Sequence, residues 1–248
     1  MTVDELVQQA CPLISHVGGL FYYDPATLRR GSELGLNSSQ LYFLGRAGAL
    51  GDVGAAVADS TLGYFAPSVV ERHWNSGSAI IRPHEAAAAH MRCSQEFGRR
   101  HLQGDWLDKF CASASAVLDA ACPVALPMFA GAKAFPLAED SPGRAMQLVT
   151  VLREFRGGTH LLAIVSAGLD PRVAHWITTS HAWANFGYRD EDAPVVADDD
   201  RERLRTANEL TDQLMVPAFS VLDDDGAAAL LAGLTEMKAQ LPVPEFPG

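Results

Sequence analysis

The sequence lacks the features that mark membrane-spanning and secreted proteins. No apolar run reaches the roughly 18–20 residues that a membrane-spanning helix needs. The first ten residues hold Asp4 and Glu5 but no lysine or arginine, whereas a secretory signal begins with basic residues. We therefore expect no membrane span and no secretory leader, and we expect a cytoplasmic location.

Local signals for metal and cofactor chemistry are also missing. None of the four cysteines forms a CxxC pair, no two of the eight histidines lie four residues apart, and HExxH and GxSxG are both absent. The sequence therefore predicts no local metal site and no nucleophile elbow of the α/β-hydrolase type. The cofactor is left unknown, and a metal or haem site assembled from distant histidines stays open.

What the sequence does contain is typical of helices. Of its 248 residues 48% are hydrophobic and 20% charged, which suits a globular protein with a substantial core. Alternating β-branched residues are scarce, and helix starts recur, for example at Asp24-Pro25, at Asn37-Ser38 and at Pro67. We expect an all-α, multi-helix protein with at most one short hairpin.

Proline and glycine divide the chain. Six of them fall within 123–143, which predicts an irregular connector between helical regions 1–122 and 144–248. The two regions can still form one compact domain. Further along, we expect helices at 144–156 and 159–167, separated near Gly157, and a helix at about 200–219.

Four ionisable residues stand alone in apolar segments. Arg46 is the only charged residue in SSQLYFLGRAGALG, and Arg156 falls within an apolar stripe of its helix. Each suits either a structural ion pair or a clamp on an anion. His16 and His160 are isolated in the same way, and each suits either a hydrogen-bonded core position or a proton-transfer role.

Buried charges need partners, so these groups are expected to converge. We predict one partly buried pocket that binds an anionic small molecule, with catalysis left open. Its ligand-binding residues are predicted to be His16, Arg46, Arg156 and His160, with Glu154 and Asp212 as the carboxylates.

The acidic charge is concentrated in one stretch. The net charge of the chain is −11, and residues 190–225 hold twelve acidic residues and three arginines, a net charge of −9. Such a stretch repels phosphate backbones, so binding to nucleic acid is expected to be absent or weak.

Three segments carry a family resemblance. The segments 41–74, 152–170 and 209–219 resemble an actinobacterial family whose members are often labelled SalK-like or EvbL-like and carry a predicted helix-turn-helix domain. The resemblance covers most of 13–186 and resumes near 209. The matching positions are Tyr42-Phe43, Arg46, Arg153-Glu154, Arg156-Gly157, His160 and Thr211-Asp212, with His16 at a family histidine.

The chain departs from the family pattern in two places. Gly158 stands where the family usually has an aspartate. The acidic stretch 189–208 stands where members carry a longer segment that resembles a winged helix. We therefore expect a helix-turn-helix-like element without a complete wing.

Two functions follow from these patterns. Isolated ionisable groups in apolar segments favour a small-molecule-binding protein. The alternative is a DNA-binding helix-turn-helix transcriptional regulator, based on a helix, a glycine turn and a second helix at 161–180. That second helix has a single base, Arg172, which argues against the alternative. Association of identical copies stays open.

Overall fold

The structure is a computed structural model that describes residues 1–243, and within this range it contains helices and no strand. The expected all-α, multi-helix fold is therefore confirmed. Short turns and four short 3₁₀ helices join the α-helices. The α-helices are α1 Val3–Val17, α2 Pro25–Glu33, α3 Ser38–Ala47, α4 Ala55–Thr61, α5 Pro67–Ser78, α6 Pro83–His101, α7 Leu107–Ala120, α8 Pro127–Lys133, α9 Ser141–Ser166, α10 Pro171–Thr179, α11 Asp200–Phe219 and α12 Asp224–Gln240.

Capping side chains set the starts of several helices. Asn37 accepts a hydrogen bond from the Gln40 backbone at 2.9 Å, and the Gln40 side chain accepts one from the Asn37 backbone at 2.9 Å. This reciprocal pair satisfies two backbone donors at the start of α3. Asp24 caps α2, whose first residue is Pro25. Both starts agree with the prediction from the sequence.

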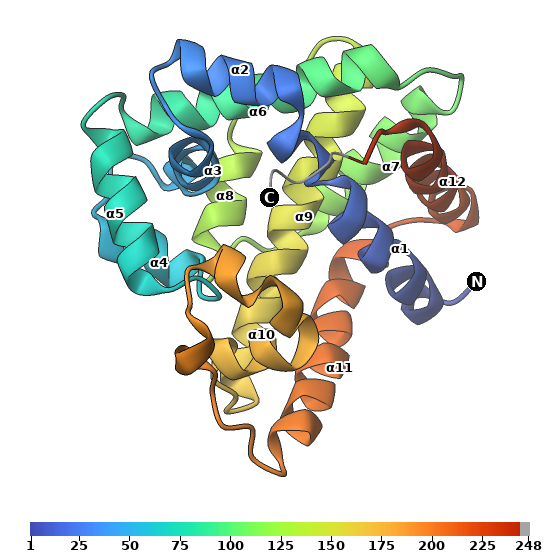
Figure 1. The fold of residues 1–248 in the computed structure, drawn as a ribbon. Coiled ribbons are helices and arrows are strands. Elements are labelled where there is room, and N and C mark those ends of the chain that lie inside the picture. The colour runs from blue at the N-terminus through green and yellow to red at the C-terminus, as the bar shows by residue number, and fades with distance from the viewer. Residues whose placement is uncertain (244–248) are drawn as a thin grey trace.

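Helix α9 passes through the middle of the molecule (Figure 1). Helices α1, α6, α7, α8 and α11 all pack against it, and they come from both sides of 123–143. Because neighbours surround it, its first four turns are buried on nearly every side, as expected of a central helix.

The expected break near Gly157 is wrong, because α9 continues without interruption from Ser141 to Ser166. A glycine inside a helix costs only about 0.5–1 kcal/mol relative to alanine. Packing on either side of the glycines offsets this cost, since Phe155 and Thr159 are each 3% exposed. The expected irregular connector also contains a short helix, α8.

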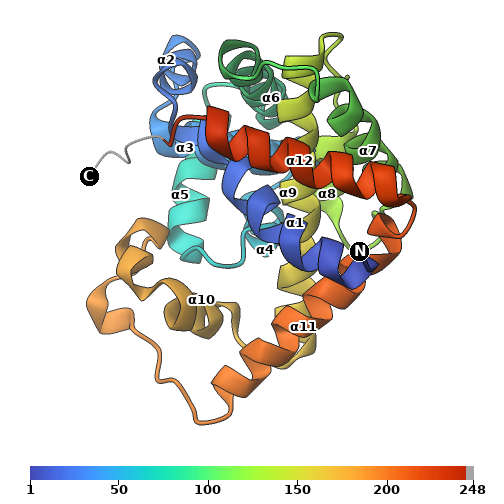
Figure 2. The same ribbon diagram turned by 90° about the vertical axis from the view of Figure 1, so that its right-hand side faces the viewer.

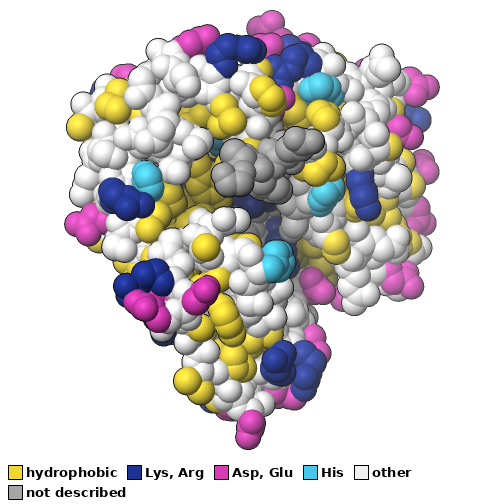
Figure 3. All heavy atoms as spheres, in the orientation of Figure 1, with side chains coloured by type: hydrophobic (Ala, Val, Ile, Leu, Met, Phe, Trp, Pro, Cys, Tyr) yellow, Lys and Arg dark blue, Asp and Glu magenta, His cyan; other side chains and the backbone are white. Residues whose placement is uncertain are grey.

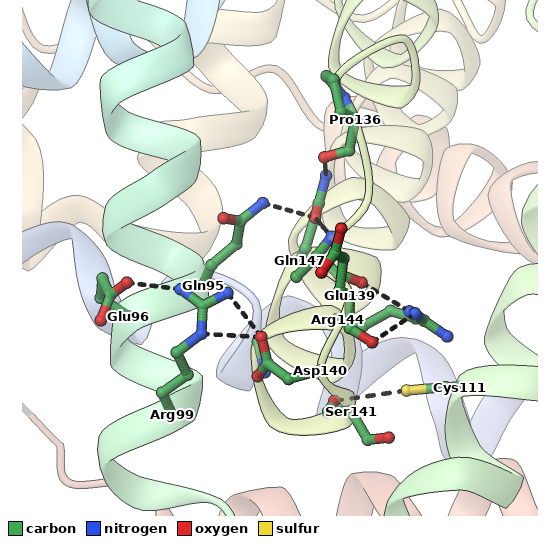
Figure 4. A network of polar contacts seen from close by, with 12 residues as sticks. Gln95, Glu96, Arg99, Cys111, Pro136, Glu139, Asp140, Ser141, Arg144 and Gln147 are labelled. Atoms are coloured by element: carbon green, nitrogen blue, oxygen red, sulfur yellow. Dashed lines mark hydrogen bonds and ion pairs between the residues drawn. The ribbon is translucent and has the colours of Figure 1, made fainter.

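A polar network fixes the start of α9 to α6 (Figure 4). Nε and Nη2 of Arg99 donate to the carboxylate of Asp140 at 2.9 and 2.6 Å, and Asp140 caps α9 through the Gly143 backbone at 2.9 Å. One turn further, the Gln147 side chain donates to the Pro136 carbonyl at 3.0 Å and accepts from Gln95 at 2.9 Å. The central helix is therefore held in one register relative to its neighbours.

Three apolar clusters surround α9. The largest joins α1, α6, α7, α9 and α12, and the second joins α3, α4 and α5. The third joins the end of α9 to α10 and α11, and forms the lower lobe in Figures 1 and 2. In residues 1–243 no helix is long and apolar enough to cross a membrane.

Candidate functional site

A buried ion pair joins α3 to α9. Nε and Nη2 of Arg46 donate to Oε1 and Oε2 of Glu154, both at 3.0 Å, so the contact is bidentate. Glu154 is 4% exposed and also accepts a hydrogen bond from Tyr22 at 3.1 Å. Tyr42 accepts a further hydrogen bond from Arg46 at 2.6 Å. The pairing explains how a charged residue is accommodated in the apolar helix α3.

The arginines keep the buried carboxylate ionised. Burial by itself raises the pKa of Glu154, but the guanidinium groups of Arg46 and Arg153 more than offset this effect and lower it to about 2. The neighbouring imidazole responds in the opposite way. Burial, assisted by the charge of Arg46, lowers the pKa of His90 to about 3, so this histidine is neutral.

A small cavity of about 190 Å³ lies beside this ion pair, and Arg46, Arg156 and His160 all line it. Arg153 and several aromatic and aliphatic side chains also line it. Nδ1 of His160 lies 2.9 Å from the hydroxyl of Thr211, and burial together with the charge of Arg156 lowers the pKa of His160 to about 4. Three of the six predicted site residues are therefore brought together.

The other three predicted residues lie elsewhere. Glu154 is next to the cavity but is fully engaged with Arg46. His16 is exposed on α1, and half-buried Asp212 on α11 is not among the lining residues. Nε of Arg156 is buried and donates no hydrogen bond to any residue in 1–243. The sequence reasoning missed Tyr22, whose hydroxyl completes the cluster from a distant 3₁₀ helix.

The expected helix-turn-helix at 161–180 consists of the end of α9, a turn and α10. Gly168 has a φ of +69°, which reverses the chain, and Asp170 caps α10. Yet α10 exposes few polar side chains, because Ala174 and His175 are buried and Arg172 is its only lysine or arginine.

A second candidate for a helix-turn-helix is α4 and α5, a segment that sequence reasoning did not single out. Helix α5 packs against both α3 and α4, and its inner side buries Val70, Trp74 and Gly77. The indole of Trp74 donates to the Val53 carbonyl at 3.0 Å, which fixes the orientation of α5. Three short helices of which the third packs against the first two are compatible with a helix-turn-helix unit.

The outer side of α5 is polar and exposed. At 100° per residue its side chains fall within an arc of about 140°, opposite the buried side. They combine a hydroxyl, a carboxylate, a guanidinium and an amide, the groups that hydrogen-bond to base edges. The residues are Ser68, Glu71, Arg72, Asn75 and Ser76. The spacing of i, i+4 and i+7 after Pro67 is the signal by which the sequence could have revealed this face.

A groove of about 610 Å³ separates the start of α5 from the lower lobe. Arg72 of α5, Arg172 of α10 and Arg189 all line it, with Asp192 beside them. Figure 3 shows Lys or Arg side chains on both sides of this boundary, with Asp or Glu side chains next to one of them. Both helix-turn-helix candidates thus border the same groove, and three arginine side chains meet there.

Comparison with known families decides between the two functional interpretations. A model described as a helix-turn-helix family matches residues 7–195. The chain belongs to this helix-turn-helix family. No curated protein and no solved structure matches the chain.

This family membership overturns two predictions. The interpretation as a small-molecule-binding protein is wrong, and so is the expectation that nucleic acid is an unlikely partner, because a helix-turn-helix family points to DNA binding. The charge argument failed because it summed over 190–225 without regard to position. The acids of that stretch are spread over several elements: Asp192 lines the groove, Asp199 pairs with Arg203 at 2.6 Å, and Asp223 to Asp225 stand at the start of α12. Charges on exposed surfaces are also screened beyond about 8 Å at physiological salt.

Proposed function

We propose that this protein is a DNA-binding transcriptional regulator that reads duplex DNA through α5. The observation that carries the proposal is the family match over residues 7–195. The exposed polar side of α5 supports it, because a helix of 12 residues is about 18 Å long and fits the major groove.

Helix α5 suits the recognition role better than α10. Its exposed side carries hydrogen-bonding groups on successive turns, among them Ser68, Arg72 and Asn75. Most of α10 is occupied by contacts with α9, α11 and the following 3₁₀ helix, which leave Arg172 and Thr178 exposed. Direct readout needs several side chains that reach base edges from one element.

The side chains of α5 imply which bases are read. Arginine makes bidentate contacts with guanine, and asparagine makes them with adenine. We therefore assign guanine recognition to Arg72 and adenine recognition to Asn75. A neighbouring hydroxyl, that of Ser68, is placed to contact a phosphate at the start of the helix.

The buried ion pair has a supporting role in this proposal. Arg46 lies on α3, the first helix of the α3–α5 unit, and Glu154 lies on the central helix α9. Their bidentate contact fastens the DNA-reading unit to the rest of the molecule. The cavity next to the ion pair lies at this contact between α3 and α9.

Two finer assignments belong to the same proposal. The segments 41–74, 152–170 and 209–219 support membership in the SalK-like or EvbL-like group of the family. A cytoplasmic location is in keeping with a regulator that reaches DNA.

The test is selection from a random duplex library, followed by binding measurements on the enriched sequence. Arg72→Ala and Asn75→Ala are each expected to weaken binding by about 1–3 kcal/mol, the worth of one bidentate base contact. Thr178→Ala on α10 and Arg92→Ala on α6 are matched controls, since both residues are exposed and neither lies on α5. Losses confined to the α10 variant would contradict the assignment to α5, and a library without enrichment would contradict the function.

A further inference from the structure

The segment 180–192 is anchored to the turn before α5. The Ala66 backbone donates to the Phe186 carbonyl at 2.9 Å, and the rings of Phe65 and Phe186 stack at 4.4 Å. Gly187 has a φ of +87°, and a Cβ there would lie 2.3 Å from the Val69 side chain. The segment is therefore seated against the start of α5 in a conformation that other residues adopt only with strain.

This anchoring places Arg189 at the groove beside α5. The Trp183 indole donates to the Arg189 carbonyl at 3.0 Å, and the rings of Trp183 and Tyr188 stack at 4.0 Å. The backbone of Arg189 is thus fixed, while its side chain is 73% exposed. An exposed guanidinium on a fixed backbone lies within reach of a partner that enters the groove.

The three arginines of the groove differ in their partners. Within residues 1–243, Arg72 and Arg172 form no ion pair, whereas Arg189 pairs with Glu191 at 2.5 Å and with Asp192 at 3.2 Å. Asp192 also lines the groove. Its carboxylate therefore occupies a position that an anionic ligand of the groove would take.

We propose that the groove holds a DNA backbone phosphate next to α5, and that the carboxylates of Glu191 and Asp192 occupy Arg189 until that phosphate replaces them. The inference rests on the DNA-binding function proposed above. Arginine pairs with phosphate as it does with carboxylate, so one anion can exchange for the other. Segment 180–192 then contacts the DNA backbone beside the recognition helix.

The carboxylates also affect specificity. Binding to non-specific DNA is almost entirely electrostatic, so a carboxylate that competes for Arg189 weakens it most strongly. In specific binding, the additional base contacts made by α5 offset the free-energy cost of displacing the carboxylates from Arg189. We therefore expect the two carboxylates to increase the ratio of specific to non-specific affinity.

The experiment measures the dissociation constants of the full chain for the enriched duplex and a scrambled duplex between about 50 and 200 mM salt. Arg189→Ala is expected to weaken binding about threefold to tenfold and to reduce the slope of log K against log salt by about 0.9, the contribution of one phosphate contact. Asp192→Asn is expected to strengthen binding, and more so for the scrambled duplex. The asparagine retains an oxygen that can accept the Arg189 backbone hydrogen bond, seen at 3.0 Å.

Controls separate the possible failures. Arg92→Ala, an exposed arginine outside the groove, is expected to leave affinity and slope unchanged. If Arg72→Ala weakens binding while Arg189→Ala and Asp192→Asn match the wild type, the phosphate site is wrong and the DNA-binding function stands. If the wild type binds no duplex, both proposals fail. Competition by inorganic phosphate beyond that of chloride at equal ionic strength would assign the groove to free phosphate instead.

Discussion

The pairing of Arg46 with Glu154 is the residue-scale feature on which the placement of α3 depends. The side chains are 11% and 5% exposed, and the contact is bidentate. Removing one partner of such a pair leaves the other buried and uncompensated, which costs far more than the pair itself contributes.

We predict that Arg46→Ala lowers the free energy of unfolding by about 3–5 kcal/mol, as measured by urea denaturation. The matched control is Arg82→Ala, because Arg82 pairs with Asp52 at 2.6 Å but its side chain is 71% exposed. Exposed pairs contribute about 0–1 kcal/mol. Equal decreases in the free energy of unfolding of the two variants would show that the buried pair does not stabilise the position of α3.

His160 makes stability depend on pH. Burial, with help from Arg156, lowers its pKa from 6.5 to about 4. Between these values the unfolded chain takes up a proton that the folded chain does not, so the folded state loses stability as pH falls. We predict that in His160→Gln the free energy of unfolding falls less steeply between pH 6.5 and 4, by up to about 1.4 kcal/mol per pH unit.

The pH profile is measured by urea denaturation at a series of pH values. His16→Gln is the matched control, since it removes an exposed histidine from α1. A profile for His160→Gln that coincides with that of the wild type would contradict the role given to this imidazole.

At the scale of elements, the continuity of α9 matters most. Two consecutive glycines interrupt its sequence pattern, but buried contacts of the residues on either side of them keep the helix continuous. A Cβ at Gly157 would meet no atom within 4 Å. The glycine therefore contributes flexibility to the unfolded chain without relieving any close contact in the folded one.

We predict that Gly157→Ala raises the free energy of unfolding by about 0.5–1 kcal/mol. Gly98→Ala in α6 is the contrasting variant, because its Cβ would lie 2.3 Å from the Pro142 carbonyl oxygen and force the helices apart. Thermal denaturation of both variants checks the prediction. A loss of stability in Gly157→Ala would mean that α9 needs a flexible point there.

The elements also show how far the sequence alone could go. Helix starts at Asp24, Asn37 and Pro67 follow from local chemistry and were predicted correctly. The continuity of α9 was not, because it depends on neighbours that are distant in sequence. Helix α5 was predicted as a helix, but its exposed polar side was not singled out, because the exposure of that side depends on how α3 and α4 cover the other side.

The candidate site divides in the same way. Arg46, Arg156 and His160, each an isolated charge or imidazole in an apolar segment, line one cavity in the structure. The pattern could not distinguish a ligand-binding pocket from a structural ion-pair network, since charged side chains are buried next to partners in both. The family match favours DNA binding over a ligand pocket.

At the scale of the whole molecule, net charge is a poor guide to partners. Helix α12 and the acidic residues at its start lie away from α5 and α10 (Figure 2). Their field is screened over about 8 Å at physiological salt, whereas the groove arginines lie next to the proposed DNA. The local charge around α5 is therefore what an approaching duplex meets.

We predict that neutralising Asp224 and Asp225 together, as Asp224→Asn and Asp225→Asn, changes DNA affinity by less than about twofold at physiological salt. Asp192→Asn, which changes a single charge at the groove, is expected to have the larger effect. Fluorescence anisotropy on the enriched duplex compares them. A larger gain from the α12 variant would show that total charge governs binding after all.

The specificity of DNA binding tests the central claim most directly. The measurement compares the dissociation constants of the wild-type chain for the enriched duplex and for a scrambled duplex of equal length at about 150 mM salt. We predict a ratio of at least about 10³, the lower end for specific regulators, and a partial loss of that ratio in Asn75→Ala. Equal affinity for the two duplexes would contradict the assignment of this protein as a sequence-reading regulator.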